Sequence, residues 1–323
     1  MRAFVTGATG FIGGRLAAQL RDRGDEVVAL VRSPQRASAL GELGCELIPG
    51  DLADQAAIRA AVEGCDGVFH VAAVYKVGIP RSERQAMLDS NVAGTAAVLD
   101  AAIVAGCPRI LYVSTVNVFG NTHGQVVDEG YRRDLSEGFL STYDEAKYRA
   151  HELAEERIAN GAPIVIAQPG GVYGPDDHSA MGHTLEQVSK GRLPLIPFPD
   201  LGICLVHVDD AAAGILQVFD GGTLGETYLL CAEATTMRQV VQAAARIAGA
   251  REPRWAMPTS LIRLSAPLGP IVGPLMGFPP NFRELVSASD GVTYWATDAK
   301  ARRELGFAPR TLEQGLRDTL AAA

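Results

Sequence analysis

A glycine-rich turn close to the N-terminus constrains this chain more than any other feature. Residues 6–13 read TGATGFIG and lie between an apolar run that starts at Ala3 and a helix-like segment. Gly7 permits a tight turn, Gly10 lets the backbone approach a pyrophosphate without a Cβ clash, and Gly13 allows close helix packing. A helix N-terminus also presents unpaired N–H groups and a partial positive charge to a phosphate. The residues expected to bind a dinucleotide there are Gly7, Thr9, Gly10, Phe11 and Ile12.

The first half of the chain alternates short apolar runs with alanine-rich segments of helical period. Strands that are apolar throughout and separated by helices are typical of a parallel sheet covered on both faces. The pattern predicts a doubly wound α/β fold, with a Rossmann dinucleotide-binding domain over residues 1–169. The expected strands are Ala3–Val5, Val27–Val31, Glu46–Ile48, Gly67–His70, Ile110–Ser114 and Ile164–Ala167. The expected helices are Phe11–Arg23, Pro34–Leu43, Gln55–Glu63, Gln85–Ala105 and Ser141–Asn160.

The pattern changes after Pro169, because glycine and proline become frequent and strands alternate less regularly with helices. We expect a smaller mixed α/β domain over residues 170–323 that binds the substrate, with about 203–220 returning to the Rossmann core. The most apolar stretch, Leu261–Phe278, contains Arg263 and several prolines and glycines, so it cannot form an unbroken membrane-spanning helix. We expect it either to pack within this domain or to cover the substrate as a lid.

Composition and charge narrow the classes of partner. The chain has 323 residues, of which 47% are hydrophobic and 20% charged, the balance of a globular protein with a substantial core. A formal net charge of -8 without a Lys/Arg cluster argues against nucleic acid as a partner. A hydrophobic strand begins directly after Met1 where a signal peptide would lie, so we expect a reducing cytoplasm. The five cysteines are scattered without a CxxC pair, and neither a metal site nor a disulfide framework is expected.

The GxxGxxG spacing of the turn resembles that of the extended short-chain dehydrogenase/reductase family. The resemblance covers essentially the whole chain, through NVAGT at 91–95, QPGGVYGP at 168–175, VHVDDA at 206–211 and DAKARRELGF at 298–307. It leaves Asn91 open between a structural and a cofactor-binding role, and it implies that His207 is structural. The further cofactor-binding residues that it implies are Asp51, Leu52, Val71, Ala72, Ala73, Pro169 and Val172.

The end of the second expected strand bears on the choice of dinucleotide. An NAD enzyme usually ends this strand with an acid that holds the ribose 2′-hydroxyl. Here Val31 takes that place and Arg32 follows, and a guanidinium matches the 2′-phosphate of NADP in charge and geometry. Arg36, one helical turn further, can assist. We therefore expect NADP, with NAD left open, against the alternative that Arg32 is a solvated surface residue.

Tyr143 and Lys147 form a YxxxK motif between the fifth and sixth expected strands. Residues i and i+4 share a face of a helix, so both side chains project together toward the cofactor. Tyrosine titrates at about pH 10, and a nearby ammonium together with the cofactor's own positive charge is expected to lower that pKa. The resemblance adds Thr115 as the hydroxyl that holds the reacting oxygen, with Ser114 in support. The alternative makes both hydroxyls local backbone caps.

Departures from the family's patterns help to sort its reaction classes. Dehydratases and decarboxylases of the family carry acids after the catalytic threonine, whereas this chain has Val116 and Asn117, which cannot move a proton at carbon. Sugar-nucleotide members carry an arginine where this chain reads GICL at 202–205, and an asparagine where it has Gln168. The remaining resemblance is to the dihydroflavonol-reductase and 3β-hydroxysteroid-dehydrogenase branch, or to the hopanoid-associated sugar-epimerase-like group.

The leading hypothesis is an NADP(H)-dependent oxidoreductase that reduces an apolar ketone or aldehyde, or oxidises the corresponding alcohol. Tyr143 would donate the proton as hydride reaches the carbonyl carbon, while Lys147 lowers its pKa and Thr115 positions the oxygen. The alternatives are an epimerase without net redox and a non-catalytic dinucleotide sensor, and the complete hydroxyl–tyrosine–lysine set argues against the sensor. The resemblance also implies a homodimer through the helices expected at 85–105 and 141–160.

We predict that the protein binds NADPH more tightly than NADH. The substitution Arg32→Asp should narrow this difference, because a carboxylate repels the 2′-phosphate and accepts a hydrogen bond from a 2′-hydroxyl. Titration of both cofactors into both proteins measures the four dissociation constants. Equal constants for NADPH and NADH in the wild type would refute the prediction.

Overall fold

Seven parallel strands form the central sheet of the computed structural model, which describes residues 1–265 and 279–321. The sheet confirms the expected doubly wound fold, and the strand order reverses between β1 and β4. A seventh strand, β10, pairs with β6 at one edge and was not expected from the sequence. In spatial order the strands are β10 (Thr227–Leu230), β6 (Ile164–Pro169), β5 (Ile110–Val113), β4 (Gly67–His70), β1 (Arg2–Thr6), β2 (Glu26–Val31) and β3 (Glu46–Pro49).

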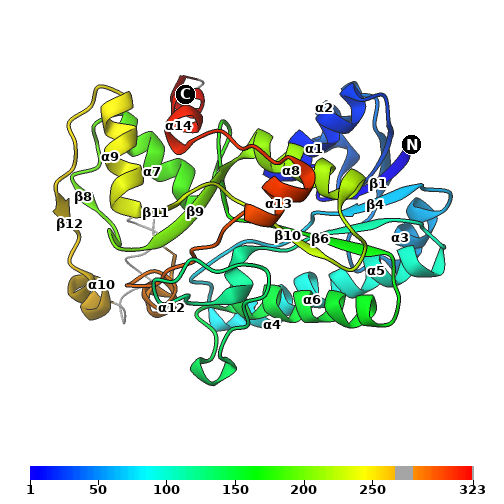
Figure 1. The fold of residues 1–323 in the computed structure, drawn as a ribbon, viewed down its shortest axis with the longest axis horizontal. Coiled ribbons are helices and arrows are strands. Elements are labelled where there is room, and N and C mark those ends of the chain that lie inside the picture. The colour runs from blue at the N-terminus through cyan, green and yellow to red at the C-terminus, as the bar shows by residue number, and fades with distance from the viewer. Residues whose placement is uncertain (266–278, 322–323) are drawn as a thin grey trace.

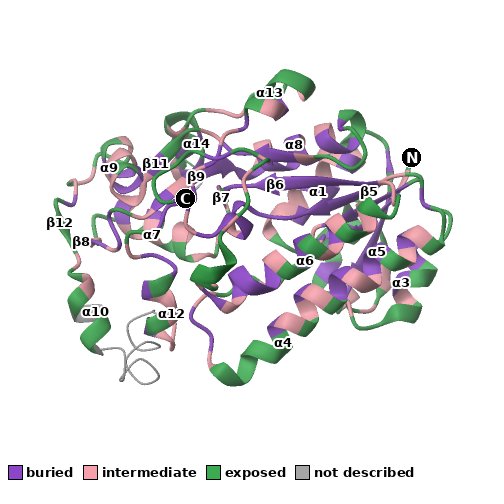
Figure 2. Cartoon of the chain, turned by 60° about the horizontal axis from the view of Figure 1, so that its bottom comes forward, coloured by how far each residue is buried: buried purple, intermediate pink, exposed green. Residues whose placement is uncertain are grey.

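Helices cover both faces of this sheet (Figure 1). On one face α1 (Phe11–Asp22) packs against α8 (Val208–Gly221), and α13 (Ala299–Leu305) packs against α8 and β10. On the other face lie α3 (Gln55–Val62), α5 (Gly94–Val104) and α6 (Thr142–Ala159). Figure 2 shows the buried strands between these two layers. Because both faces of the sheet are covered, the side chains on both sides of each strand are mostly apolar, and the strands appear in the sequence as continuous hydrophobic runs.

Two expected helices are irregular in the structure. The segment expected at Pro34–Leu43 divides into a 3-10 turn (Pro34–Ala37) and α2 (Ser38–Glu42). The helix expected at Gln85–Ala105 begins as α4 (Arg84–Leu88), passes through a π-helical turn (Asp89–Ala93) and continues as α5.

Asn91 in the π-helical turn has a structural role. Its side-chain oxygen accepts a hydrogen bond from the Val74 N–H at 2.7 Å, and its amide donates to the Val74 carbonyl at 3.0 Å. The Thr95 hydroxyl donates to the Asn91 carbonyl at 2.6 Å, so it satisfies an acceptor that the wide turn leaves available. This clamp fixes the chain segment that follows β4.

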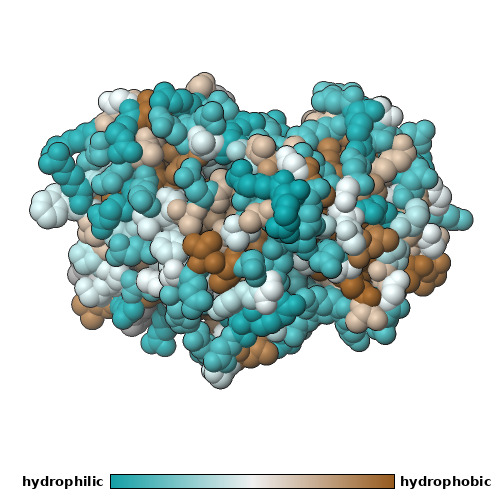
Figure 3. All heavy atoms as spheres, in the orientation of Figure 1, coloured by the Kyte–Doolittle hydropathy of each residue, from teal (hydrophilic) through white to brown (hydrophobic). Residues whose placement is uncertain are grey.

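The continuous helical stretch Arg81–Val104 is long and apolar enough, by length and composition alone, to cross a membrane. Such a stretch is weak support for a membrane span, because core helices meet the same test. Here α5 packs against α3 and α6. On the face shown in Figure 3, hydrophilic residues predominate and apolar ones gather in small separate groups.

The second half of the chain contributes both to the central-sheet layer and to a smaller sheet with its own helices. We expected residues 203–220 to rejoin the Rossmann core, and within this segment α8 packs on α1. By contrast, β9 (Gly202–His207) pairs with β7 (Gly171–Tyr173) and β11 (Ala234–Thr236) in the small sheet. Helices α7 (Ala180–Ser189), α9 (Met237–Ile247) and α14 (Leu312–Ala321) pack together around that sheet. The remaining elements are the strand pair β8 (Leu195–Ile196) and β12 (Trp255–Ala256), with α10 (Thr259–Ser265) and α12 (Phe282–Ser287).

We expected the stretch Leu261–Phe278 to pack within the second domain or to form a lid. Most of this stretch lies outside the described residues, which exclude 266–278. All five cysteines are buried and free, and each packs as a small apolar side chain.

Candidate active site

A cleft of about 2080 Å³ lies between the carboxyl ends of the central strands and the second half of the chain. It opens where the strand order reverses, the usual ligand position in doubly wound sheets. The cleft is lined by the glycine turn, by the loops after β2, β4 and β5, and by the start of α6. Every residue expected at the site except Arg36 lines it.

The glycine turn is closely packed, and side chains larger than that of glycine at Gly7 or Gly13 would collide with neighbouring backbone atoms. Gly7 has a φ of +78°, and a Cβ there would lie 2.7 Å from the Ala72 nitrogen. A Cβ on Gly13 would collide with the Gly7 carbonyl oxygen, so this glycine lets α1 approach the turn itself. Gly10 caps α1 without a side-chain hydrogen bond, which leaves the first amides of the helix open to the cleft. These residues fit the pyrophosphate of a dinucleotide.

The two arginines after β2 differ in position. Arg32 is exposed, lines the cleft, and makes no ion pair with any described residue. Arg36 lies on the 3-10 turn that Pro34 starts and does not reach the cleft lining. Asp51 turns its carboxylate toward the backbone N–H groups of Ala53 and Asp54, at 2.8 and 3.2 Å.

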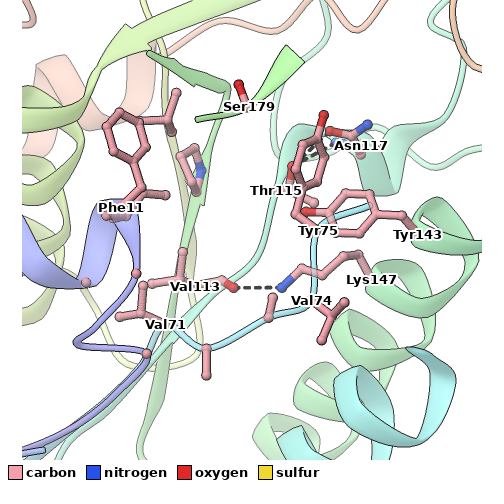
Figure 4. A pocket seen from close by; sticks show the side chains of 18 of the residues that line it. Phe11, Val71, Val74, Tyr75, Val113, Thr115, Asn117, Tyr143, Lys147 and Ser179 are labelled. Carbon is pink, nitrogen blue, oxygen red and sulfur yellow. Dashed lines mark hydrogen bonds between the residues drawn. The ribbon is translucent and has the colours of Figure 1, made fainter. Parts of the chain in front are cut away.

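Tyr143 and Lys147 project from α6 into the same part of the cleft (Figure 4). The Lys147 ammonium donates to the Val113 carbonyl at 2.9 Å and to the Tyr112 hydroxyl at 3.1 Å. Burial lowers the pKa of Lys147 to about 7. Burial also raises the pKa of Tyr143 above its ordinary value, with a smaller opposing effect from a hydrogen bond to Thr115.

The expectation that Lys147 and the bound dinucleotide together lower the pKa of Tyr143 concerns the loaded enzyme, whereas in the chain alone burial raises that pKa. The desolvation of a buried phenolate dominates, and the ammonium points at Val113 and Tyr112 rather than at Tyr143. Tyr143 keeps its proton, which is the form that can donate to a carbonyl oxygen.

Thr115 caps the backbone locally and also lines the cleft. The capping role and the role of holding the reacting oxygen are therefore compatible for its hydroxyl. Its Oγ1 donates to the Asn117 side-chain oxygen at 3.0 Å and accepts from the Asn117 backbone N–H at 3.3 Å. The Gln168 amide donates to the Thr115 carbonyl at 3.1 Å. These contacts hold the hydroxyl toward Tyr143 (Figure 4).

Ser114 is buried, and its hydroxyl pairs with His151 Nδ1 on α6 at 2.8 Å. Its backbone N–H donates to the Ala167 carbonyl in the neighbouring strand at 2.8 Å. The side chain thus joins the end of β5 to α6 behind Lys147.

A buried ion pair that motif reasoning missed holds the start of α6. Arg133 Nη1 and Asp144 Oδ1 lie 2.5 Å apart, and their side chains are 5% and 1% exposed. Asp144 also accepts from the Leu140 N–H at 2.8 Å, and the Ser141 hydroxyl caps the helix at the Asp144 N–H. Because Asp144 is turned toward Arg133, the adjacent Tyr143 faces the cleft. Arg133 belongs to no recognisable motif, and only the folded chain brings it to α6.

Tyr75, in the loop after β4, was also missed by sequence reasoning. Its ring packs edge-on against Tyr143, with the ring centroids 4.7 Å apart. It lines the cleft, and 59% of the residue is exposed. It therefore covers Tyr143 from the solvent side.

Comparison with known proteins agrees with this geometry. The model of the NAD dependent epimerase/dehydratase family matches residues 3–231. A putative dihydroflavonol 4-reductase from Synechocystis is 31% identical over 98% of this chain and 93% of its own length. Sterol demethylase protein B from Methylococcus capsulatus is 30% identical over 99% of this chain and 98% of its own length. The crystal structure of gox2253 superposes with a TM-score of 0.82 at 30% identity, covering 99% of this chain and 97% of that chain.

The chain belongs to the NAD dependent epimerase/dehydratase family, within the extended short-chain dehydrogenases/reductases. It is therefore an NAD(P)-dependent enzyme of that family, and the resemblance seen in its motifs is confirmed.

We predict that Arg133→Ala destabilises the fold by about 3–5 kcal/mol, because it leaves the buried Asp144 carboxylate without its partner. The exposed neighbour provides the control, since Arg132→Ala should cost at most about 1 kcal/mol. Urea denaturation of the three proteins measures these free energies of unfolding. Equal losses in the two variants would show that the buried pair does not hold α6.

We predict a pH-dependent stability that Lys147 carries. In the folded protein its pKa is about 7, whereas in the unfolded chain it returns to about 10.4. The unfolded chain then binds more protons between these pH values, so this group's contribution to stability rises with pH, by at most about 1.4 kcal/mol per pH unit. Denaturation of cofactor-free wild type and Lys147→Met at pH 7, 8 and 9 should show the wild type gaining relative to the variant. A constant difference would contradict the shifted pKa.

Proposed function

We propose that this protein is an NADP(H)-dependent reductase of a neutral, largely apolar ketone or aldehyde. The observation that carries the proposal is the lining of the cleft on the side of the second half of the chain. Among described residues beyond Pro169, that lining contains no lysine or arginine. Its apolar members include Met181, Phe198, Leu201, Leu285 and Tyr294.

The charged groups on this side disfavour a nucleotide-sugar substrate. Asp176 and Asp177 line the cleft and would repel a diphosphate, and the histidines there are His178 and His183. Arg15 also lines the cleft, but its guanidinium pairs with Asp176 at 3.3 Å and Asp209 at 3.5 Å. The names of two relatives refer to a dihydroflavonol and a sterol, which agrees with a bulky apolar ligand.

The position next to Thr115 disfavours dehydration. Val116 is buried and apolar, and Asn117 offers an amide whose oxygen is occupied by the Thr115 hydroxyl. An elimination needs a carboxylate or another base to move a proton at carbon. Neither side chain can act in that way, so simple carbonyl reduction fits the site better.

The cofactor would be held by the glycine turn, by the backbone of residues 71–73, and by Arg32 at the 2′-phosphate. Arg32 supports NADP over NAD because its guanidinium has no ionic partner among the described residues and Val31 replaces the usual acid. When bound, the dinucleotide supplies or accepts the hydride.

The chain's own residues supply the proton and the orientation. Tyr143, protonated in its buried position, gives its phenolic proton to the substrate oxygen as negative charge develops there. Thr115, held by Asn117, fixes the oxygen at hydrogen-bond distance from Tyr143. The positive form of Lys147 stabilises the phenolate that remains after proton transfer. Ser114 supports this arrangement from behind, through His151.

A sugar epimerase is the second candidate, because the family contains epimerases by name. It would oxidise and re-reduce one carbon, so it would retain its cofactor and consume no NADPH. The homodimer through α4–α5 and α6 belongs to the same proposal. Light scattering of the purified protein measures that oligomeric state.

We predict that the wild type oxidises NADPH with steroid, flavonoid or diketone substrates and leaves nucleotide sugars unchanged. The substitution Tyr143→Phe should lower kcat by at least about 100-fold, since the proton donor is lost. Its dissociation constant for NADPH should remain within about threefold, because the turn and Arg32 are untouched. Epimerised nucleotide sugar without NADPH consumption would favour the second candidate instead. Full activity of the phenylalanine variant would overturn the assignment of Tyr143.

A further inference from the structure

A continuous run of polar side chains leads from the active site to the protein surface. Lys147 donates to the Tyr112 hydroxyl at 3.1 Å, and Tyr112 is hydrogen-bonded to Ser114. Ser114 Oγ lies 2.8 Å from His151 Nδ1, and His151 Nε2 lies 3.5 Å from the Glu155 carboxylate.

The run passes from buried to exposed surroundings. Lys147, Tyr112 and Ser114 are 3%, 1% and 3% exposed. The His151 side chain is 11% exposed and that of Glu155 is 41% exposed. Each member can both give and receive a proton except the terminal carboxylate, which meets water.

Carbonyl reduction, as proposed above, consumes one proton per turnover. Tyr143 supplies it and becomes a phenolate, yet Tyr143 is only 7% exposed and Tyr75 packs against its ring. The next turnover therefore requires a route by which a proton from water reaches α6. Lys147, one helical turn from Tyr143, is the inner end of the observed run.

We propose that Tyr112, Ser114 and His151 conduct protons between Glu155 at the surface and Lys147, and so re-protonate Tyr143 after each reduction. This inference rests on the proposed function. The Lys147 ammonium, which is hydrogen-bonded to Tyr112 and Val113 in this structure, turns toward Tyr143 and gives a proton to its phenolate. Lys147 takes one from Tyr112, Tyr112 from Ser114, Ser114 from the His151 imidazolium, and His151 from water beside Glu155. One O–H bond is restored on Tyr143 and one proton leaves bulk water, so the sequence balances.

Tyr112 must act in concert with its neighbours. Burial raises the pKa of its phenol above the ordinary value, so a free phenolate there is costly. A proton handed to Lys147 is therefore replaced in the same motion by the proton of Ser114. The hydrogen bonds of Tyr112 to Lys147, at 3.1 Å, and to Ser114 permit this.

A second branch from Tyr112 does not lead to water. Tyr112 is also hydrogen-bonded to Thr95, which lies 2.9 Å from His70 Nε2, and His70 Nδ1 lies 2.7 Å from the Thr6 hydroxyl. All three residues beyond Tyr112 are at most 2% exposed. Burial and the charge of Lys147 lower the pKa of His70 to about 3, so it remains neutral. This branch anchors the network at the glycine turn, and the exit is through His151.

The charged groups around the outer end favour proton uptake. Glu155 contacts His151 along α6, and Arg132 from the preceding loop lies 3.5 Å from the same carboxylate. The hydrogen bond to His151 is the main cause that lowers the pKa of Glu155, which keeps a negative charge beside the imidazole. A carboxylate at this place stabilises the imidazolium that the path requires.

The decisive variant is His151→Asn, because an asparagine can keep the hydrogen bond to Ser114 but cannot carry a proton at neutral pH. Stopped-flow mixing of the NADPH-loaded enzyme with an active ketone separates the first turnover from later ones. The first turnover should proceed within about twofold of the wild-type rate, since Tyr143 already holds its proton. Steady-state turnover should fall at least about tenfold, because re-protonation becomes slow.

A second variant tests the same path by rescue. His151→Ala opens space beside the surface, and added imidazole should restore steady-state turnover in a concentration-dependent way without changing the first turnover. The matched control is Glu152→Gln, since Glu152 is exposed and adjacent in sequence, and among the described residues its side chain hydrogen-bonds only with the Tyr148 hydroxyl, at 2.9 Å. It should behave as the wild type in both phases. Melting temperature and NADPH affinity, measured for all proteins, report loss of structure separately.

The outcomes separate the two proposals. Equal slowing of the first and later turnovers in His151→Asn, or unchanged turnover in every phase, would overturn the proton path while leaving the reductase assignment intact. Wild-type enzyme that reduces no carbonyl compound would instead contradict the proposed function. Slow later turnovers that imidazole restores would support both.

Discussion

The reversal of strand order between β1 and β4 is the constraint on which the site depends. At that point the connections leave the sheet toward opposite faces, α1 on one side and α5 and α6 on the other. The carboxyl ends of β1, β4 and β5 are therefore uncovered by their own helices. The glycine turn, the Val71–Ala73 segment and Thr115 meet in this space. The second half of the chain lines the other side of this space, through β9 of the small sheet and Leu285 of α12.

Burial then decides the chemistry of the groups gathered there. The same low-dielectric surroundings keep Tyr143 protonated, bring the pKa of Lys147 to about 7, and keep His70 neutral. The proposed carbonyl reduction needs a proton donor that is protonated and a lysine that can change its charge without large cost. Buried hydrogen bonds among Lys147, Tyr112 and Ser114 connect these states into one network.

The proposed preference for an apolar substrate follows from the outer wall of the cleft, which is the part lined by residues beyond Pro169. A nucleotide diphosphate needs cations, whereas the described lining of the second half offers apolar side chains, two aspartates and two histidines. The fold is shared with epimerases and dehydratases, so the fold alone does not assign a reaction. The proposed distinction rests on side chains such as Asn117 and on the charge of the outer wall.

Patterns that are local along the chain were predictable from the sequence. The apolar strands, the glycine turn and the YxxxK pair each depend on neighbours within a few residues, so spacing and periodicity reveal them. The strand β10 was missed because four residues without a distinct period do not identify an element. The π-helical turn at Asn91 was missed because the contact that holds it is with Val74, in the loop after β4 rather than along the helix.

The sequence by itself determined the fold class, the dinucleotide turn and the identity of the tyrosine, lysine and threonine at the site. Only the tertiary structure decided their protonation states, the clamp of Arg133 on Asp144, and the path from Lys147 to His151. The physical reason is that desolvation and buried hydrogen bonds depend on which side chains the fold brings together. Arg133 lies 11 residues from Asp144, and Ser114 lies 37 residues from His151. No spacing rule connects such partners before the chain has folded.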